Sequence, residues 1–278
     1  MRISPLTPTI GADIFDVDLS VSSQDLPLSD ISQAFLRYHV LFFRNQQMTP
    51  EDIVRFARLF GPVGAYPFAE PLPNHPEVIA IIKEPEQRTV FGGIWHTDST
   101  YLATPSLASV LYAVEVPDLG GDTLFANMHA AWEHLDPELQ NKLRHLKAFH
   151  SSVKNRSVLR ADHLQGGSMK GETSPELQAS HPLVRQHPDS GRLSLYISPA
   201  HTVRIEGLPE AESDELLGSL YQHALQDDFK CRFRWSPGTL AIWDNRCTLH
   251  YPVNDYHGQR REMYRVTIEG SAPVSKMD

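Results

Sequence analysis

A histidine and an aspartate two residues apart, His96 and Asp98, form the chemically most suggestive stretch of this sequence. In an extended backbone, residues i and i+2 project from the same face, so the imidazole and the carboxylate could share one metal ion. The preceding stretch, 92–95, holds two glycines and is compatible with the end of a strand. Because such a pair is common by chance, a plain polar loop is an equally good interpretation of this stretch alone.

Three other segments carry a similar pair, and their context argues against metal binding. His134 lies in a segment typical of a helix, where residues i and i+2 do not face each other. Asp136, which precedes Pro137, is typical of a helix N-cap. His187 is followed by proline, aspartate, serine and glycine, which indicate a turn between strands. His75 lies between a proline-rich loop and a strand.

Length and composition limit the class of protein. With 278 residues, 41% of them hydrophobic, the chain suits one domain over 1–278 with a sizeable core. It has no apolar run of 18 residues, and its first residues lack the apolar segment of a signal peptide. The two cysteines make no disulfide framework, so we expect free thiols and a cytoplasmic location. The net charge of −9 argues against a nucleic-acid surface, and we expect no nucleic-acid or membrane partner.

The pattern along the chain predicts many short strands, with helices concentrated in the first half and one late helix. Helices are expected at 28–38, 50–60, 128–135, 137–147 and 213–224, and the main strands at 40–43, 78–82, 106–115, 193–197, 230–235, 239–243 and 264–269. This order predicts an α+β fold with a β-sandwich or barrel at its centre. Residues 64–94 and 151–180, which are rich in loop signals, are expected to be mobile lid segments.

The C-terminal third holds residues that could complete a site. His250 follows strand-like sequence, and Arg261 and Arg265 flank the beginning of another strand. Two histidines and one carboxylate leave three octahedral positions of a metal open, as a non-haem Fe(II) oxygenase requires for a bidentate co-substrate and O₂. Taken singly, His250 is more often a packed strand histidine, and the arginines are more often part of a solvated charge run.

Taken together, these stretches resemble the Fe(II)/2-oxoglutarate-dependent dioxygenases of the taurine dioxygenase and 2,4-dichlorophenoxyacetate dioxygenase (TauD/TfdA) family. The resemblance covers essentially the whole chain, and the order and spacing of its motifs are specific. The matching segments are 11–19, 39–44, 95–100 (WHTDST), 120–123 (GGDT), 243–251 (WDNRCTLHY) and 260–265 (RREMYR). The fold that this resemblance implies is a double-stranded β-helix, or jelly roll, flanked by helices.

The resemblance implies a role for each matching residue. His96, Asp98 and His250 would be the iron ligands. Arg261, eleven residues after His250, would hold the far carboxylate of 2-oxoglutarate with help from Thr123. A guanidinium suits that task because it binds a carboxylate through two parallel hydrogen bonds.

Arg265 matches the arginine that reaches the acidic head group of the substrate in taurine dioxygenase. The rest of the taurine pocket is not reproduced: Tyr66 stands in place of a histidine, Gly92 of an asparagine and His201 of a phenylalanine. Ser99, next to the metal-ligand pair, is expected to contact the substrate. Each lost charge-assisted bond is worth about 1.5–3 kcal/mol, so taurine itself should bind poorly.

The resemblance implies an enzyme that uses Fe(II), 2-oxoglutarate and O₂, releases succinate and CO₂, and hydroxylates a small organic anion. The expected substrates are alkylsulfonates, sulfate esters, and aryloxyalkanoates or other carboxylates. Hydroxylation or desaturation of an amino-acid-like molecule is an alternative. Alternatives of other classes are a jelly-roll sensor that binds metal without turnover and a zinc hydrolase with the same ligands. A homo-oligomer, either a dimer or a tetramer, is expected from the relatives.

Overall fold

A computed structural model of the chain describes residues 1–154 and 176–275. The strands of the largest sheet are β1 (Arg2–Pro5), β2 (Ala12–Phe15), β3 (Val40–Phe43), β4 (Val63–Gly64), β5 (Pro71–Leu72), β6 (His75–Lys83), β7 (Ala108–Glu115), β15 (Leu240–Asp244) and β17 (Arg261–Ile268). A second sheet contains β8 (Thr123–Asn127), β14 (Lys230–Phe233) and β16 (Thr248–Pro252). Outside these two sheets lie β9 (Lys147–Ser151), β10 (Gln178–Pro182), β11 (Val184–Gln186), β12 (Leu193–Leu195) and β13 (Thr202–Ile205). The helices are α1 (Leu28–Tyr38), α2 (Pro50–Ala57), α3 (Met128–Glu133), α4 (Pro137–Leu143) and α6 (Glu210–Ala224).

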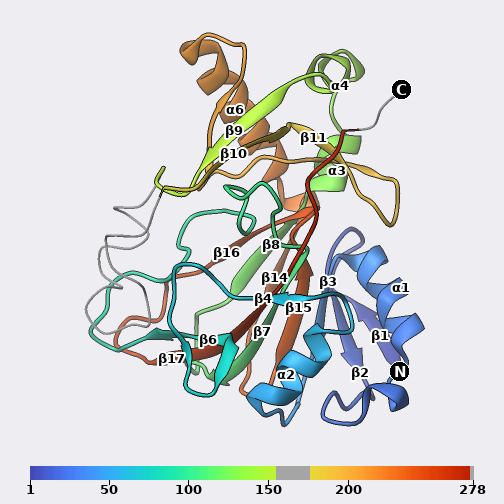
Figure 1. Cartoon of the computed structure of the whole chain (residues 1–278), viewed down its shortest axis with the longest axis vertical. Helices are drawn as coiled ribbons and strands as arrows, with labels where there is room; N and C mark the ends of the chain where they lie inside the picture. Colours follow the sequence, from blue (N-terminus) through green and yellow to red (C-terminus); the bar gives the residue numbers. More distant parts are fainter. Residues whose placement is uncertain (155–175, 276–278) are drawn as a thin grey trace.

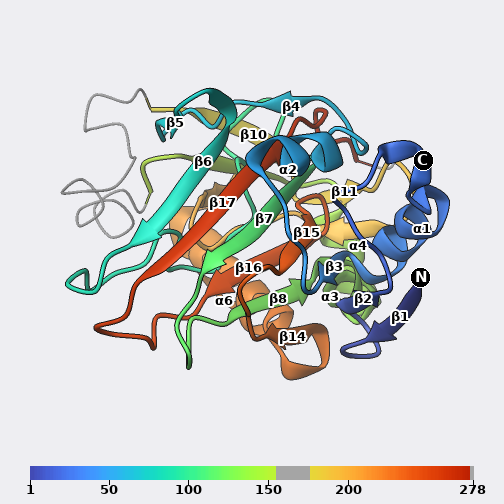
Figure 2. The same ribbon diagram turned by 90° about the horizontal axis from the view of Figure 1, so that it is seen from below.

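The two main sheets pack against each other as a jelly roll (Figures 1 and 2). Within the described residues, the large sheet has the order β1-β2-β3-β15-β7-β17-β6-β5, with β4 pairing to β17, and the second sheet has the order β14-β8-β16. Strands that are distant in sequence therefore become neighbours, as when β15 pairs with both β3 and β7. The result is the α+β jelly roll that the resemblance implied.

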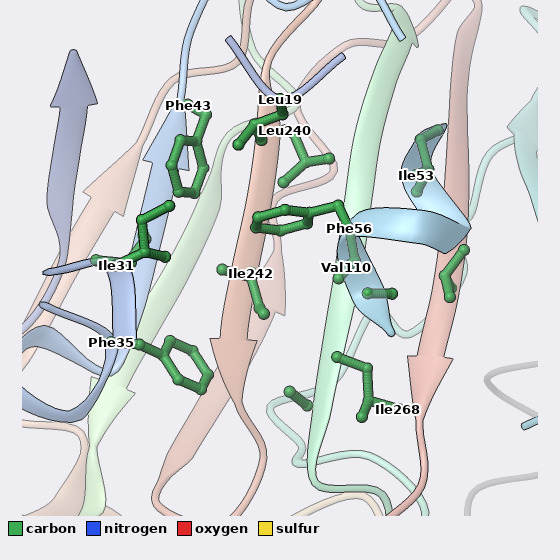
Figure 3. Close-up of a cluster of buried hydrophobic side chains, with 14 of the residues drawn as sticks. Leu19, Ile31, Phe35, Phe43, Ile53, Phe56, Val110, Leu240, Ile242 and Ile268 are labelled. Carbon is green, nitrogen blue, oxygen red and sulfur yellow. The ribbon is translucent and has the colours of Figure 1, made fainter. Parts of the chain in front are cut away.

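The large sheet is buried on both faces, which explains why its central strands are continuous apolar runs. In β3, Val40 and Phe42 point between the two sheets. Leu41 and Phe43 point to the opposite face, which α1 and α2 cover (Figure 3). The rings of Phe42 and Phe233 stack with their centroids 3.6 Å apart, which joins the two sheets directly.

Helix α2 begins at the capping box that the sequence predicts. The Thr49 hydroxyl accepts a hydrogen bond from the backbone of Asp52, and the Asp52 carboxylate accepts one from the backbone of Thr49. Pro50 occupies the first turn, where its missing N–H costs nothing. Ile53 and Phe56 are then buried against the large sheet. A local sequence signal thus fixes the helix that covers this face.

Among the differences from the prediction, three have a clear cause in the contacts of the chain. The helix expected over 137–147 ends at Leu143, and β9 follows because its backbone pairs with β10 and β13. Helix α6 begins at Glu210, before the Ser213 expected to cap it, and the Ser213 hydroxyl accepts instead from the backbone of Ile205. Strand β16 was not predicted, because its threonine, histidine and tyrosine mask the apolar alternation.

The two segments expected to be mobile lids, 64–94 and 151–180, remain predictions. Residues 75–83 of the first segment form β6 inside the large sheet. Most of the second segment, 155–175, lies outside the described residues. Among the described helices, none combines the length and apolar character needed to cross a lipid bilayer.

Candidate active site

His96 and His250 come together because the segment that carries His96 pairs with strand β16. The amide of His96 donates to the carbonyl of His250 at 3.0 Å, and the amide of His250 donates to the carbonyl of His96 at 2.7 Å. The two imidazole rings then lie with their centroids 4.0 Å apart. The main chain, not the side chains, brings these distant residues together.

Asp98 faces both imidazoles. Its Oδ1 lies 3.8 Å from His96 Nε2 and 3.9 Å from His250 Nε2. All three side chains are buried, and their candidate ligand atoms lie within 4.8 Å of one another. The residues predicted as metal ligands are thus brought together, and two imidazoles with one carboxylate are a donor set suited to non-haem iron.

The second carboxylate oxygen of Asp98 is held by two donors. The Ser109 hydroxyl donates to Oδ2 at 2.7 Å, and Arg265 Nη2 lies 2.9 Å from the same atom. Burial alone would raise the pKa of Asp98, but the Arg265 charge and the two imidazoles hold that pKa well below its usual range. Asp98 is therefore an anion at neutral pH, with Oδ1 facing the histidines.

Both histidines are neutral and suited to metal binding. His96 Nδ1 donates to the carbonyl of Ile94 at 2.7 Å. Nε2 is therefore unprotonated, and its lone pair can bind a metal ion. Burial lowers the pKa of His96 and lowers the pKa of His250 still more clearly. Neutral imidazole is the form that coordinates metal ions.

Gly92 makes room for the His96 ring. Its φ is +72°, a backbone conformation that L side chains rarely adopt. A Cβ at this position would lie only 2.8 Å from His96 Cε1. A side chain at position 92 would therefore require the His96 ring or the backbone of this loop to shift.

The motif at 243–246 holds residues next to Asp98 through hydrogen bonds. The Asn245 amide donates to the Ser109 hydroxyl at 3.1 Å, and its own carbonyl oxygen accepts from Trp243 Nε1 at 2.9 Å. The Thr97 hydroxyl donates to the backbone carbonyl of Asn245 at 2.8 Å. These bonds fix Thr97, which precedes Asp98, and Ser109, which donates to the Asp98 carboxylate. The sequence prediction missed Ser109, whose only signal is a lone serine within an apolar strand.

Arg261 is a buried cation beside the triad. Strand β17 places Arg261 and Arg265 on the same face of the sheet. Within the described residues, no carboxylate pairs with Arg261, and its Nε and Nη2 have no hydrogen-bond partner. Burial lowers its pKa, while the hydroxyl of Tyr256 opposes that shift. A buried charge without a counter-ion is costly, so this geometry suits an anionic ligand.

A cavity of about 40 Å³ joins these groups. Thr123 and Arg261 line it together with Arg265 and the two histidines. Its apolar walls are Ile81, Phe91, Leu111, Trp243 and Pro252. Trp235 Nε1 donates to the Thr123 hydroxyl oxygen at 2.9 Å, which leaves the Thr123 O–H as a donor. The polar end of the cavity therefore offers hydrogen-bond donors and positive charge.

The remaining predicted site residues lie at different distances from this cavity. The Arg265 guanidinium lies over the Tyr66 ring, 5.0 Å from its centroid. The His201 ring lies 6.2 Å from the ring of His96. Ser99 is buried with a φ of 60° and is not among the residues that line the cavity. Tyr66 and His201 are thus near the site, whereas Ser99 serves the turn that follows Asp98.

The chain is similar to known proteins over nearly its whole length. The family model described as "Taurine catabolism dioxygenase TauD, TfdA family" matches residues 2–267. The chain is 34% identical to the alpha-ketoglutarate-dependent 2,4-dichlorophenoxyacetate dioxygenase of Cupriavidus pinatubonensis, with 98% of both chains covered. It is also 34% identical to the alpha-ketoglutarate-dependent sulfate ester dioxygenase of Pseudomonas putida, over 99% of this chain and 91% of the relative.

A solved structure leads to the same conclusion. A taurine dioxygenase from Burkholderia xenovorans matches with a TM-score of 0.84 and 34% identity, over 99% of this chain and 91% of the other. The resemblance seen in the sequence and the jelly-roll fold are both confirmed. The chain belongs to the TauD/TfdA family of Fe(II)- and 2-oxoglutarate-dependent dioxygenases.

Proposed function

We propose that this dioxygenase hydroxylates a small organic anion with an apolar or aromatic body, using Fe(II), 2-oxoglutarate and O₂. The observation that carries the proposal is the buried guanidinium of Arg261, whose Nε and Nη2 have no partner in the described part of the chain and which lies beside a buried His/Asp/His group. A metal site alone would not require this second cation. A co-substrate with a distal carboxylate accounts for both features.

His96, Asp98 and His250 would hold the iron. The fit rests on their donor set: Asp98 Oδ1 faces both Nε2 atoms, while Oδ2 is occupied by Ser109 and Arg265. Asp98 would therefore bind through one oxygen. Three protein ligands leave coordination positions open for co-substrate and O₂. When bound, the iron and 2-oxoglutarate supply the oxidising chemistry and yield succinate and CO₂.

Arg261 and Thr123 would orient 2-oxoglutarate. The guanidinium would take the distal carboxylate bidentately, and the Thr123 hydroxyl would add a third donor. Tyr256, whose hydroxyl contacts Arg261, would fix the direction of the guanidinium. These residues set the position of the co-substrate relative to the triad, and positioning of this kind accounts for a large part of catalysis.

Arg265 and Tyr66 would select the primary substrate. Arg265 has a buried Nε without a partner among the described residues, and the Tyr66 ring covers its guanidinium. A carboxylate, sulfonate or sulfate ester would bind at this cation. The Tyr66 ring is followed by Phe68 and Tyr101 in edge-to-face contacts, which favour an apolar or aromatic substrate body and exclude water. This fits an aryloxyalkanoate or alkyl sulfate ester better than taurine.

A succinate-release assay tests this proposal. Iron-loaded enzyme is incubated with 2-oxoglutarate, O₂ and aryloxyacids, alkyl sulfate esters, alkylsulfonates, taurine or amino acids. We expect substrate-dependent succinate with the first two classes and little with taurine. Preference for an amino acid would support the alternative that the enzyme hydroxylates or desaturates an amino-acid-like molecule. Absence of succinate with every class would favour the sensor, and activity with zinc alone would favour the hydrolase.

Two further expectations concern the protein as a whole. We propose that the chain is cytoplasmic, in keeping with its free cysteines. We also propose that it forms a homo-oligomer, either a dimer or a tetramer, as its relatives commonly do. Light scattering coupled to size-exclusion chromatography tests the oligomeric state, and a monomer would contradict it.

A further inference from the structure

A second group of metal-ligating side chains lies outside the proposed active site. His39 lies between α1 and β3, His129 in the first turn of α3, and Cys247 in the connection between β15 and β16. Their candidate ligand atoms lie within 4.8 Å of one another, as do those of the active-site triad. All three residues are at most 2% exposed. None of them takes part in the function proposed above.

We propose that His39, His129 and Cys247 form a structural binding site for a soft divalent ion of the Zn²⁺ class. One thiolate and two imidazoles are a donor set that such ions prefer over the oxygen-rich sets of Mg²⁺ or Ca²⁺. A fourth position would be filled by water or remain open. The proposal is independent of the dioxygenase activity, because it uses no residue of the iron, co-substrate or substrate site.

Each of the two imidazoles has a buried ring nitrogen without a hydrogen-bond partner within residues 1–154 and 176–275. His129 Nδ1 donates to the carbonyl of Leu193 at 2.7 Å, so Nε2 is unprotonated and carries a lone pair. This Nε2 is buried without a partner among the described residues. His39 Nδ1 is likewise buried without a partner in that part of the chain. Its Nε2 has only a long contact, 3.5 Å, with Arg192. Buried polar atoms are nearly always satisfied, so two such atoms on imidazoles that lie beside one thiol indicate a missing partner.

A neighbouring group provides a contrast. His187 and Asp244 also lie within 4.8 Å of Cys247. However, His187 Nε2 donates to Asp244 at 2.9 Å, and His187 Nδ1 accepts from the backbones of Asp189 and Ser190. Both nitrogens of His187 are therefore in use. These hydrogen bonds give His187 a structural role. In the described part of the chain, the unpartnered nitrogens of His39 and His129 have no such explanation.

The local charges permit a cation at this place. Two arginines lie near, but each is paired with carboxylates of its own: Arg246 with Asp244 and Asp189, and Arg192 with Glu133. They therefore add little net positive charge to the cluster. Binding would displace the proton of the Cys247 thiol into solvent, and the resulting thiolate would neutralise half of the charge of a divalent ion.

The protonation states suit ligands of this kind. Burial lowers the pKa of His39 to about 4 and the pKa of His129 to about 3, so both imidazoles are neutral at physiological pH. Burial raises the pKa of the Cys247 thiol, so the apoprotein holds a neutral thiol rather than an unpaired anion. The apoprotein thus carries no uncompensated charge in this cluster.

Backbone hydrogen bonds already hold the three ligand-bearing segments together. The amide of Met128 donates to the carbonyl of Cys247 at 2.9 Å, and the amide of Asp244 donates to the carbonyl of His39 at 2.9 Å. The Asn127 side chain caps α3 by accepting from the amide of His129 at 2.9 Å. An ion here would tie α3 and the start of β3 to the connection between β15 and β16, and β16 carries the proposed iron ligand His250.

Cobalt tests this site because it reports sulfur ligation optically. The full chain is refolded with Co²⁺ under anaerobic conditions, and bound cobalt and the near-ultraviolet spectrum are measured. The proposed active-site triad contains no sulfur, so a thiolate-to-cobalt charge-transfer band can come only from a cysteine. We expect about two ions per chain together with this band, and a single ion without the band in Cys247→Ser.

Matched variants complete the test. Cys231→Ser removes the other buried thiol and should leave the band unchanged, whereas His96→Ala should remove one ion and keep the band. His129→Gln should weaken the band, which covers the case in which Cys247→Ser does not fold. A folded wild-type protein without the band would overturn the proposal, as would loss of the band in Cys231→Ser instead of Cys247→Ser. Neither result would bear on succinate release.

Discussion

Arg265 Nη2 lies 2.9 Å from Asp98 Oδ2, so the cation expected to bind the substrate is already bonded to a proposed iron ligand. Arg265 therefore links the two sites. It holds Asp98 in its charged state and orientation before any substrate arrives. A substrate anion at the remaining donors of Arg265 would then be placed against the iron by the same side chain.

This link predicts that Arg265→Ala weakens iron binding even without substrate. A charge-assisted hydrogen bond is worth about 1.5–3 kcal/mol, so we expect Fe(II) affinity to fall at least about tenfold and substrate KM to rise. Anaerobic Fe(II) titration and succinate kinetics measure the two effects separately. A change in substrate KM with unchanged iron affinity would show that the contact with Asp98 does not matter.

Gly92→Ala should damage the iron site through the His96 ring. The added Cβ would meet His96 Cε1 at 2.8 Å, so the ring must move. The control is Gly258→Ala: Gly258 has a φ of +77°, close to the +72° of Gly92, but a Cβ there would meet nothing within 4 Å. Both variants should lose similar stability from backbone strain, and only Gly92→Ala should lose iron affinity. Equal affinities in the two variants would refute this role for Gly92.

Ser109→Ala should leave Asp98 Oδ2 with one donor instead of two. Removing a hydrogen bond to a buried carboxylate costs about 1.5–3 kcal/mol, so iron affinity should fall about tenfold or more while the fold is kept. Ser106→Ala is the matched control, because Ser106 contacts Asn245 but not Asp98. If both variants bind iron equally well, Ser109 supports the fold rather than the ligand.

The stability of the protein should fall in mild acid, in part because of His150. Burial holds the pKa of this histidine well below its ordinary value of 6.5, so the folded state keeps it neutral where the unfolded chain takes up a proton. Its contribution is therefore complete above pH 6.5 and is lost as the pH falls below that value. Each such proton changes the free energy of unfolding by about 1.4 kcal/mol per pH unit.

His150→Gln should reduce this acid dependence. Denaturant unfolding of wild type and variant between pH 7 and pH 5 measures the slope, which should become shallower by up to about 1.4 kcal/mol per pH unit. His257→Gln, at an exposed position, should leave the slope unchanged. Equal slopes for wild type and His150→Gln would contradict the prediction.

The elements that local sequence determines were predicted well. Helix α1 has the predicted bounds, and α2 begins at its capping box, because spacing and capping act within a few residues. Strand β16 and the end of α4 were not predicted, since pairing with distant strands decides them. Tertiary context often overrides local preference in this way.

The candidate site also contains some residues that the sequence predicts and others that only tertiary contacts reveal. The candidate ligands and the two arginines carry motif spacing, and the structure places them close together. Ser109 and Tyr256 carry no motif, and they were found only through their contacts with Asp98 and Arg261. The need for glycine at position 92 is likewise visible only when the His96 ring is in place.

The most direct test of the central claim is an anaerobic titration of metal-free protein with Fe(II) and then 2-oxoglutarate. The visible charge-transfer band of the chelate reports binding. We expect the band in wild type, and about a tenfold or larger increase in the 2-oxoglutarate concentration needed in Arg261→Ala. Arg260→Ala is the control, because the neighbouring Arg260 pairs with Glu84, Glu115 and Glu262 instead. Iron binding without the band, or equal behaviour of the two variants, would contradict the account.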